Sequence, residues 1–186
     1  MKQKGFYMAS EFGFRPCKIE DLKGQPKVQK MLQIYIKAAQ IKKESFPHTI
    51  ITGQSGCGKT ATANVIAHEL GYGFKAFSGP AINDKKVIDE ILLNLKDNDV
   101  LFIDEIHRIS QRLQESLYFA MEQFQADVVV DGVATRVSLP HFTLIAATNL
   151  YGGLNDALLN RFPIQIKLAA YSKADMASIV EKICQE

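Results

Sequence analysis

Two kinds of hydrophobic pattern alternate along this chain of 186 residues. Short runs of apolar or β-branched residues, which are typical of buried strands, lie at residues 49–52, 74–77, 100–103, 142–147 and 164–168. Helix-like segments, in which most apolar residues recur every three or four positions, lie at residues 26–43, 61–70, 87–95, 110–124 and 176–183. This alternation predicts an α/β fold, with a mainly parallel sheet sandwiched between two layers of helices.

Turn and capping residues add detail to this outline. Asp131-Gly132 separates residues 127–130 from residues 135–139, and a two-residue turn of this type predicts a short β-hairpin. Side chains that can accept hydrogen bonds from the first N–H groups of a helix predict three helix starts. These residues are Asn83, Asn155 and the pair Ser172 with Asp175.

The segment from Gly53 to Thr60 fits the phosphate-binding pattern G-x-x-x-x-G-K-[ST] at every required position. It lies between a predicted strand and a predicted helix, as a phosphate-binding loop (P-loop) does. Lys59 would contact the β- and γ-phosphates of ATP, and the Thr60 hydroxyl would bind Mg²⁺. We expect the nucleotide to be held by Gly53, Gly56, Cys57, Gly58, Lys59, Thr60 and Ala61, together with Asp104.

Asp104 and Glu105 directly follow the apolar run at residues 100–103. Asp104 would hold the hydration shell of Mg²⁺, and Glu105 would orient and deprotonate the attacking water. The alternative is an acidic pair that begins an exposed helix, where carboxylates suit the helix dipole. The P-loop upstream, at a spacing common in P-loop ATPases, favours the nucleotide site.

Composition limits the class of protein. The chain is 47% hydrophobic and long enough for one principal domain. The apolar runs are strand-sized and no secretion signal is visible, so we expect no contact with a membrane. Cys17, Cys57 and Cys184 lack metal-ligand spacing, and an odd count suits a reducing, cytoplasmic compartment. His107 has no spaced companions, so we expect it to pack or hydrogen-bond, and we expect no metal beyond Mg²⁺.

Charge is unevenly distributed. Residues 1–43 contain ten Lys or Arg against three Asp or Glu, although the net charge of the whole chain is only +2. Lys27, Lys30 and Lys37 share one face of the helix predicted at residues 26–43. Such a face could contact nucleic acid or an acidic neighbouring subunit. The simpler interpretation, which we favour, is a solvated helix face.

The order of four motifs resembles that of the AAA+ ATPases; the motifs are Gly53 to Thr60, Val100 to Glu105, Ala147-Thr148-Asn149 and Asn160-Arg161-Phe162. Other segments resemble more closely the RuvB family, the bacterial Holliday-junction branch-migration motors. They include Arg15-Pro16, Gly24-Gln25-Pro26, Ser78-Gly79-Pro80, Ala120-Met121-Glu122 and residues 139–144. The resemblance extends from about Arg15 nearly to the C-terminus.

This resemblance implies a homo-hexameric ring on duplex DNA that couples ATP hydrolysis to DNA translocation, with RuvA as its junction-binding partner. Asn149 matches the sensor 1 position, which contacts the γ-phosphate. Arg161 matches the arginine finger, which enters the site of the neighbouring subunit. The stretch from Leu22 to Gln25 matches the lining of the adenine pocket. The alternative for Arg161 is an ordinary surface or ion-paired arginine.

The sequence also departs from the family. Leu150 stands where the family has an arginine, and the hairpin that docks the partner is shorter, so engagement of a RuvA-like partner stays open. The family continues beyond the last predicted helix into a helical lid and a DNA-binding winged helix. The chain could be an excised fragment or a trimmed relative of the family. We expect a fragment, because lid helices would normally cover the apolar stripe of that last helix; the alternative is that the stripe packs back on the core.

We therefore predict three parts: an N-terminal arm with the adenine-pocket segment (1–25), a large AAA+ ATPase subdomain (26–170) and the first helix of a lid (171–186). The predicted function is that of an ATP-hydrolysing motor core acting on Holliday junctions. One alternative is an AAA+ loader or remodeller of a clamp or helicase. Another is a module that binds the nucleotide without turnover.

Overall fold

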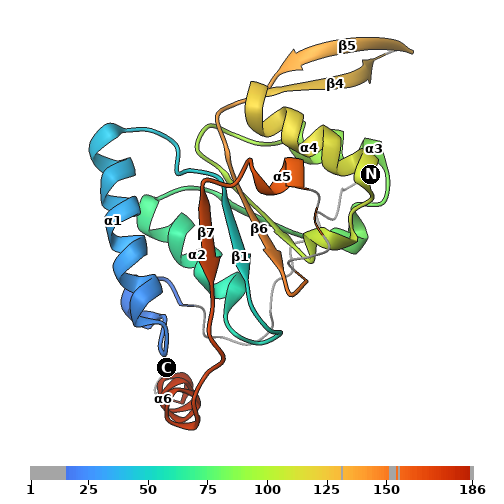
Figure 1. The fold of residues 1–186 in the computed structure, drawn as a ribbon. Helices are drawn as coiled ribbons and strands as arrows, with labels where there is room; N and C mark the ends of the chain where they lie inside the picture. Colours follow the sequence, from blue (N-terminus) through green and yellow to red (C-terminus); the bar gives the residue numbers. More distant parts are fainter. Residues whose placement is uncertain (1–15, 131, 151–153, 155, 185–186) are drawn as a thin grey trace.

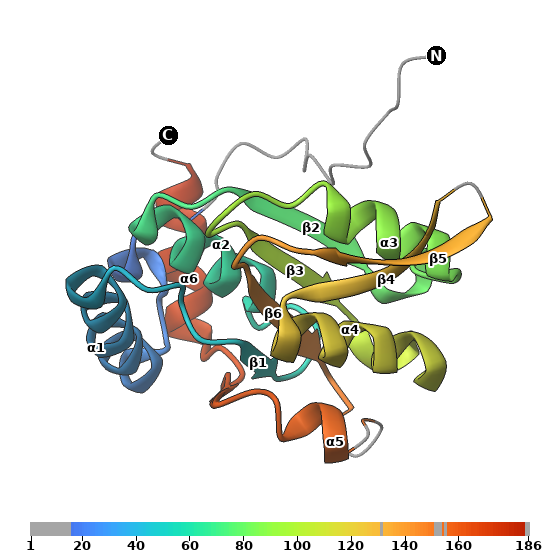
Figure 2. The same cartoon turned by 90° about the horizontal axis from the view of Figure 1, so that it is seen from above.

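A five-stranded parallel sheet forms the centre of the molecule, in the strand order β2-β3-β6-β1-β7 (Figures 1 and 2). The computed structural model describes residues 16–130, 132–150, 154 and 156–184. The strands of the sheet are β1 (Thr49–Thr52), β2 (Phe74–Ser78), β3 (Val100–Asp104), β6 (Thr143–Thr148) and β7 (Ile164–Lys167). All five predicted strands are therefore present, and the predicted parallel sheet is confirmed.

Helices cover both faces of this sheet, which makes a three-layer sandwich (Figures 1 and 2). On one face lie α1 (Pro26–Lys42) and α2 (Lys59–Leu70); on the other lie α3 (Lys85–Leu93) and α4 (Gln111–Gln123). Successive strand residues alternate between the two cores: Ile50 packs with the α3 and α4 side, and Ile51 with the α1 and α2 side. The middle residues of the central strands are therefore apolar, because both faces of these strands are buried.

The antiparallel hairpin is separate from the sheet and extends from the end of α4 (Figure 1). Its strands, β4 (Gln125–Val130) and β5 (Val133–Ser138), are each longer than the pattern predicted. Asp127 lies directly opposite Arg136, and the two form an ion pair across the strands. Val129 and Val133 are largely exposed on the hairpin surface.

The predicted helix starts have three outcomes. Ser172 and Asp175 form the predicted capping box at the start of α6 (Lys173–Ile183), where the Asp175 N–H donates to Ser172 Oγ over 3.1 Å. The Asn83 cap is wrong: α3 begins one residue later, and the Asp84 carboxylate accepts from the Lys86 N–H over 3.2 Å. Asn155 lies outside the described residues; the short α5 (Asp156–Leu159) follows it.

The outer face of α6 is apolar and exposed. Met176, Val180 and Ile183 are 49%, 54% and 49% exposed, and no residue of this helix is buried. The alternative in which this stripe packs back on the core is therefore wrong for this structure. None of the helices in the described part of the chain has the length and apolar character that a membrane crossing requires.

Candidate nucleotide site

The P-loop connects the end of β1 to the start of α2, at the carboxyl end of the sheet. Gly58 is the cap residue of α2 and has φ +93°, a conformation that residues with a side chain rarely adopt. A Cβ at this position would lie 2.5 Å from the Tyr171 hydroxyl, so a side chain here would also displace Tyr171. The N-terminus of α2 therefore opens onto a glycine-rich turn, the geometry that binds phosphate groups.

Two side chains of the P-loop point in different directions. Lys59 Nζ folds over the loop and donates to the carbonyl oxygens of Gly53 (3.1 Å) and Gln54 (2.9 Å). Cys57 is buried in the core beneath the loop, so a contact between Cys57 and a phosphate would involve its main chain. Thr60 lies in the first turn of α2 and is exposed.

The acidic pair lies at the end of β3, two strands away from β1. Asp104 Oδ1 accepts a hydrogen bond from the Glu105 N–H over 2.9 Å. Glu105 has φ +51°, and its carboxylate forms a 3.2 Å ion pair with Arg108 in the 3₁₀ helix η3 (Ile106–Arg108). A non-glycine residue in this region costs about 1–3 kcal/mol of strain, a cost often found at functional sites.

Gly79 explains how the chain accommodates this turn. It begins the 3₁₀ helix η2 (Gly79–Ala81) directly after β2, and a Cβ there would lie 2.4 Å from the Glu105 carbonyl oxygen. A side chain at position 79 would therefore push the turn that carries Glu105 out of place. This contact gives a physical reason for the glycine of the Ser78-Gly79-Pro80 segment.

The end of β6 lies between these two parts of the site. The Gly53 N–H donates to the Thr148 carbonyl over 3.3 Å, which joins the P-loop to β6. Thr148 Oγ1 lies 2.9 Å from His107 Nδ1 and accepts from the Leu150 N–H over 3.0 Å. His107 thus hydrogen-bonds as predicted, and no cluster of metal-ligating side chains occurs among the described residues. Asn149 follows Thr148 and is exposed.

Four of the predicted residues therefore lie at the carboxyl end of three adjacent strands: Lys59 after β1, Asp104 and Glu105 after β3, and Asn149 after β6. Arg161 lies elsewhere. It follows α5 and precedes β7, which is parallel to β1, so it is at the amino end of the sheet. One strand length of about 13 Å separates the two ends of the sheet, so Arg161 is remote from the P-loop of its own chain.

Sequence reasoning predicted the helix after β7 but did not connect this segment with the nucleotide site. Tyr171 lies against Gly58, and burial, followed by the nearby Cys57 and Asp175, raises the pKa of its phenol. The Gln25 side chain donates to the Ala169 carbonyl (2.7 Å) and accepts from the Ala169 N–H (3.1 Å). Asp21 pairs with Lys182 of α6. Residues 169–182 thus join the predicted adenine segment to the P-loop, although nothing in the sequence relates parts so far apart.

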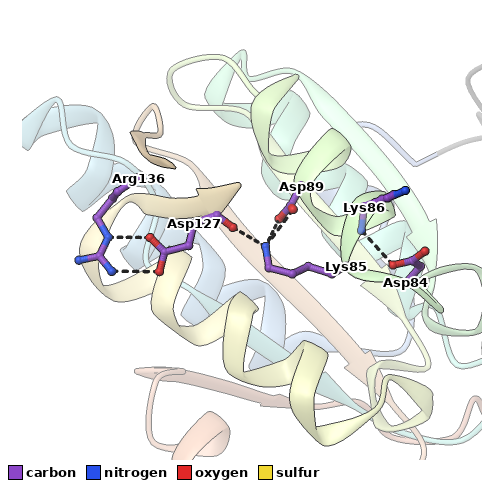
Figure 3. Close-up of polar contacts among 6 residues, drawn as sticks. All are labelled: Asp84, Lys85, Lys86, Asp89, Asp127 and Arg136. Carbon is purple, nitrogen blue, oxygen red and sulfur yellow. Dashed lines mark hydrogen bonds and ion pairs between the residues drawn. The ribbon is translucent and has the colours of Figure 1, made fainter. Parts of the chain in front are cut away.

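A groove of about 280 Å³ lies away from the P-loop, between α3, α4 and β4, and three of its charged residues, Lys85, Asp89 and Asp127, take part in the polar contacts drawn in Figure 3. Lys85 donates to Asp89 (2.7 Å) and to the Asp127 carbonyl. Arg136 donates to the Asp127 carboxylate (2.7 and 2.9 Å) and thereby lowers the pKa of that carboxyl. These contacts attach the hairpin to α3.

A parallel sheet with a P-loop after one strand and an acidic pair after another defines the P-loop NTPase class. Residues 14–168 match the family described as the Holliday junction DNA helicase RuvB P-loop domain, and the chain belongs to this family.

Comparison with solved structures gives the same family. The Thermotoga maritima RuvB Holliday junction branch migration motor is 35% identical, with a TM-score of 0.80 over 90% of this chain and 53% of that one. A single-substitution variant of the same protein is also 35% identical, with a TM-score of 0.83 over 91% and 54%. NtrX from Brucella abortus in complex with ADP, at 20% identity and a TM-score of 0.63 over 88% of this chain and 41% of that one, shares the fold. This chain spans about half the length of the RuvB structures.

Proposed function

We propose that this chain is the ATP-binding and ATP-hydrolysing core of a RuvB-like DNA motor. The observation that carries this proposal is the convergence of Lys59, Asp104, Glu105 and Asn149 at one end of the sheet, beside the N-terminus of α2. A backbone cradle, one lysine and two carboxylates are the groups that phosphoryl transfer needs. Membership of the RuvB P-loop family favours a motor over a loader or a module without turnover.

Each residue has a role that follows from its position. Lys59 would exchange its bonds to the Gly53 and Gln54 carbonyl oxygens for the β- and γ-phosphates. Glu105 would orient the attacking water and accept its proton, and Asn149 would contact the γ-phosphate. Tyr171, which lies against Gly58, would border the nucleotide on the side of the adenine segment.

Mg²⁺ fits the donors that are available. The Thr60 hydroxyl and the Asp104 carboxylate supply the oxygen ligands that this ion prefers. Asp104 uses one oxygen to accept the Glu105 N–H, which leaves its other oxygen for a bound cation or its waters. When bound, Mg²⁺ would neutralise charge that develops on the phosphate oxygens.

We assign Arg161 to the site of a neighbouring subunit, because it lies at the opposite end of the sheet from its own P-loop. This assignment requires an assembly, which we propose is a homo-hexameric ring on duplex or four-way-junction DNA. Work on DNA would place the protein in the cytoplasm. The exposed hairpin is the surface on which a RuvA-like partner would dock.

ATP turnover at rising protein concentration, with and without four-way-junction DNA, tests this function. We expect turnover to rise more steeply than protein concentration and to increase with junction DNA. Glu105→Gln should lower the rate by about 10²- to 10⁴-fold while nucleotide binding persists, because only the general base is lost. Arg161→Ala should also abolish turnover. Nucleotide binding without turnover under every condition would contradict the proposed activity of this chain.

A further inference from the structure

Arg161 is held by two side chains of α4. Its Nη2 lies 3.0 Å from Glu122 Oε1 and 3.2 Å from Oε2, and its guanidinium carbon lies 5.9 Å from the centre of the Tyr118 ring. Tyr118 and Glu122 are four residues apart and therefore share one face of α4. The Glu122 carboxylate and the Tyr118 ring together bind the guanidinium group of Arg161. We call this pair of side chains the Arg161 clamp.

The Arg161 clamp does not satisfy every hydrogen-bond donor of the guanidinium group. Arg161 Nε is buried and has no hydrogen-bond partner among the described residues. The side chains of Arg161 and Glu122 are 36% and 45% exposed, and ion pairs as exposed as this one are weak. A buried donor without a partner further destabilises the arrangement. The clamp therefore holds Arg161 in a conformation that it can leave at low cost.

A phosphate group would compete directly with Glu122. Both are anions with oxygen atoms that match the planar donors of a guanidinium, and a phosphate offers an additional acceptor. The same Nη2 donor cannot pair fully with both. A phosphate contact through Nη2 therefore requires the arginine to release Glu122 first, or at the same time.

We propose that Glu122 and Tyr118 hold Arg161 against its own subunit and compete with the phosphate of the nucleotide bound by the neighbour. This inference rests on the proposed function. It makes Glu122 a positioning residue, which limits how often the arginine is delivered to the neighbouring site. The sequence motif Ala120-Met121-Glu122 has no role in the nucleotide site, and the proposal gives its last residue the role of holding Arg161.

The test compares Glu122→Gln with Glu115→Gln, which removes the same charge two turns earlier on α4. Two quantities are measured on the full chain: ATP turnover at a concentration that supports assembly, and the modification of Arg161 by phenylglyoxal, quantified by peptide mass spectrometry. We expect Glu122→Gln to raise kcat by about two- to five-fold, as loss of a weak ion pair allows, with KM for ATP unchanged. Phenylglyoxal should modify Arg161 faster in this variant, and Glu115→Gln should change neither quantity.

Two results would overturn the proposal. Unchanged phenylglyoxal reactivity of Arg161 in Glu122→Gln would mean that the clamp does not hold the guanidinium. Faster modification with an unchanged or lower kcat would mean that the contact does not compete with delivery. If the unsubstituted chain shows no turnover at any concentration, the proposed function fails, and the phenylglyoxal reactivity alone then decides whether Glu122 restrains Arg161.

Discussion

The two ends of the sheet hold their key side chains in different ways. At the carboxyl end, the backbone sets the positions, because Gly58 and Glu105 have positive φ angles. At the amino end, Arg161 depends on side chains of α4, in an exposed ion pair, and its Nε has no hydrogen-bond partner in the part of the chain that the structure describes. Backbone geometry suits groups that must stay in place, and a weak side-chain contact suits a group that must move.

The largest effect is expected on ATP turnover when two inactive variants, one altered at each end of the sheet, are mixed. Lys59→Ala disables the carboxyl end, and Arg161→Ala disables the amino end; an arginine finger alone contributes about 10³- to 10⁵-fold to turnover. If the two ends serve different subunits, an equimolar mixture should regain about a quarter of the active sites, because random neighbours restore some interfaces. ATP turnover of the mixture measures this recovery.

Mixtures that stay inactive, although each variant still assembles, would show that both ends act within one chain. Each variant should first be titrated alone over the same total concentration. That control separates true complementation from residual activity of either variant.

Alanine substitutions in the P-loop would separate two costs to stability at the carboxyl end of the sheet. One is the strain of a side chain at positive φ, and the other is steric overlap with Tyr171. Gly58→Ala and Gly56→Ala both place a side chain at positive φ, but only position 58 brings the new Cβ against the Tyr171 hydroxyl; at position 56 nothing lies within 4 Å. We expect Gly56→Ala to lower the free energy of unfolding by about 1 kcal/mol and Gly58→Ala by about 2–4 kcal/mol. Urea denaturation measures both.

Tyr171→Phe provides the matched background, since it removes only the hydroxyl oxygen that the new Cβ would meet. In this background Gly58→Ala should approach the cost of Gly56→Ala. Equal costs of the two alanine substitutions in the original chain would contradict the described contact with Tyr171.

The capping box of α6 provides a smaller test at the carboxyl end. Ser172→Ala removes the acceptor for the Asp175 N–H, which should lower stability by about 0.5–2 kcal/mol. Ser178→Ala, in the middle of the same helix, should have little effect. Hydrogen exchange of the α6 amides locates the loss, and equal protection in the two variants would refute the cap.

The smallest effect is expected from pH at the amino end. His48 accepts from the Leu144 N–H (2.9 Å) and donates from Nε2 to the Met121 carbonyl (3.2 Å), beside Glu122 on α4, so its ring is neutral. Burial lowers its pKa, so the unfolded chain binds the proton more readily. Its contribution to stability is fully present above about pH 6.5 and is lost as pH falls through the folded-state value.

Urea midpoints between pH 7.5 and 5.5 should therefore fall more steeply for the unsubstituted chain than for His48→Gln. His68→Gln, at an exposed position on α2, is the control. Parallel pH profiles for all three proteins would show that His48 is not the group responsible.

Sequence patterns predicted the sheet and most helices because burial on one or both faces leaves a local signature, as in residues 100–103. They also predicted the P-loop, whose residues are contiguous. They misplaced the α3 cap, because Asn83 and Asp84 are both good caps and only tertiary packing selects between them. The sequence allowed an ion pair for Arg161 as an alternative, and the structure shows one. The partners in that pair and the role of Tyr171 escaped prediction, because contacts between distant segments leave no periodic pattern.

The contact between Gln25 and Ala169 has a consequence for the order of folding. These residues are 144 positions apart, and Asp21 and Lys182 are 161 apart. Ala169 comes directly after β7, and pairing of β7 with β1 shortens the loop that remains to be closed between residues 25 and 169, so we expect this contact to form after that pairing. The contacts that join residues 169–182 to Asp21 and Gln25, which we call the wall beside the P-loop, would form after the sheet. They would also break first when the chain begins to unfold. A ligand that bridges this wall and the P-loop would then slow unfolding more than it speeds folding.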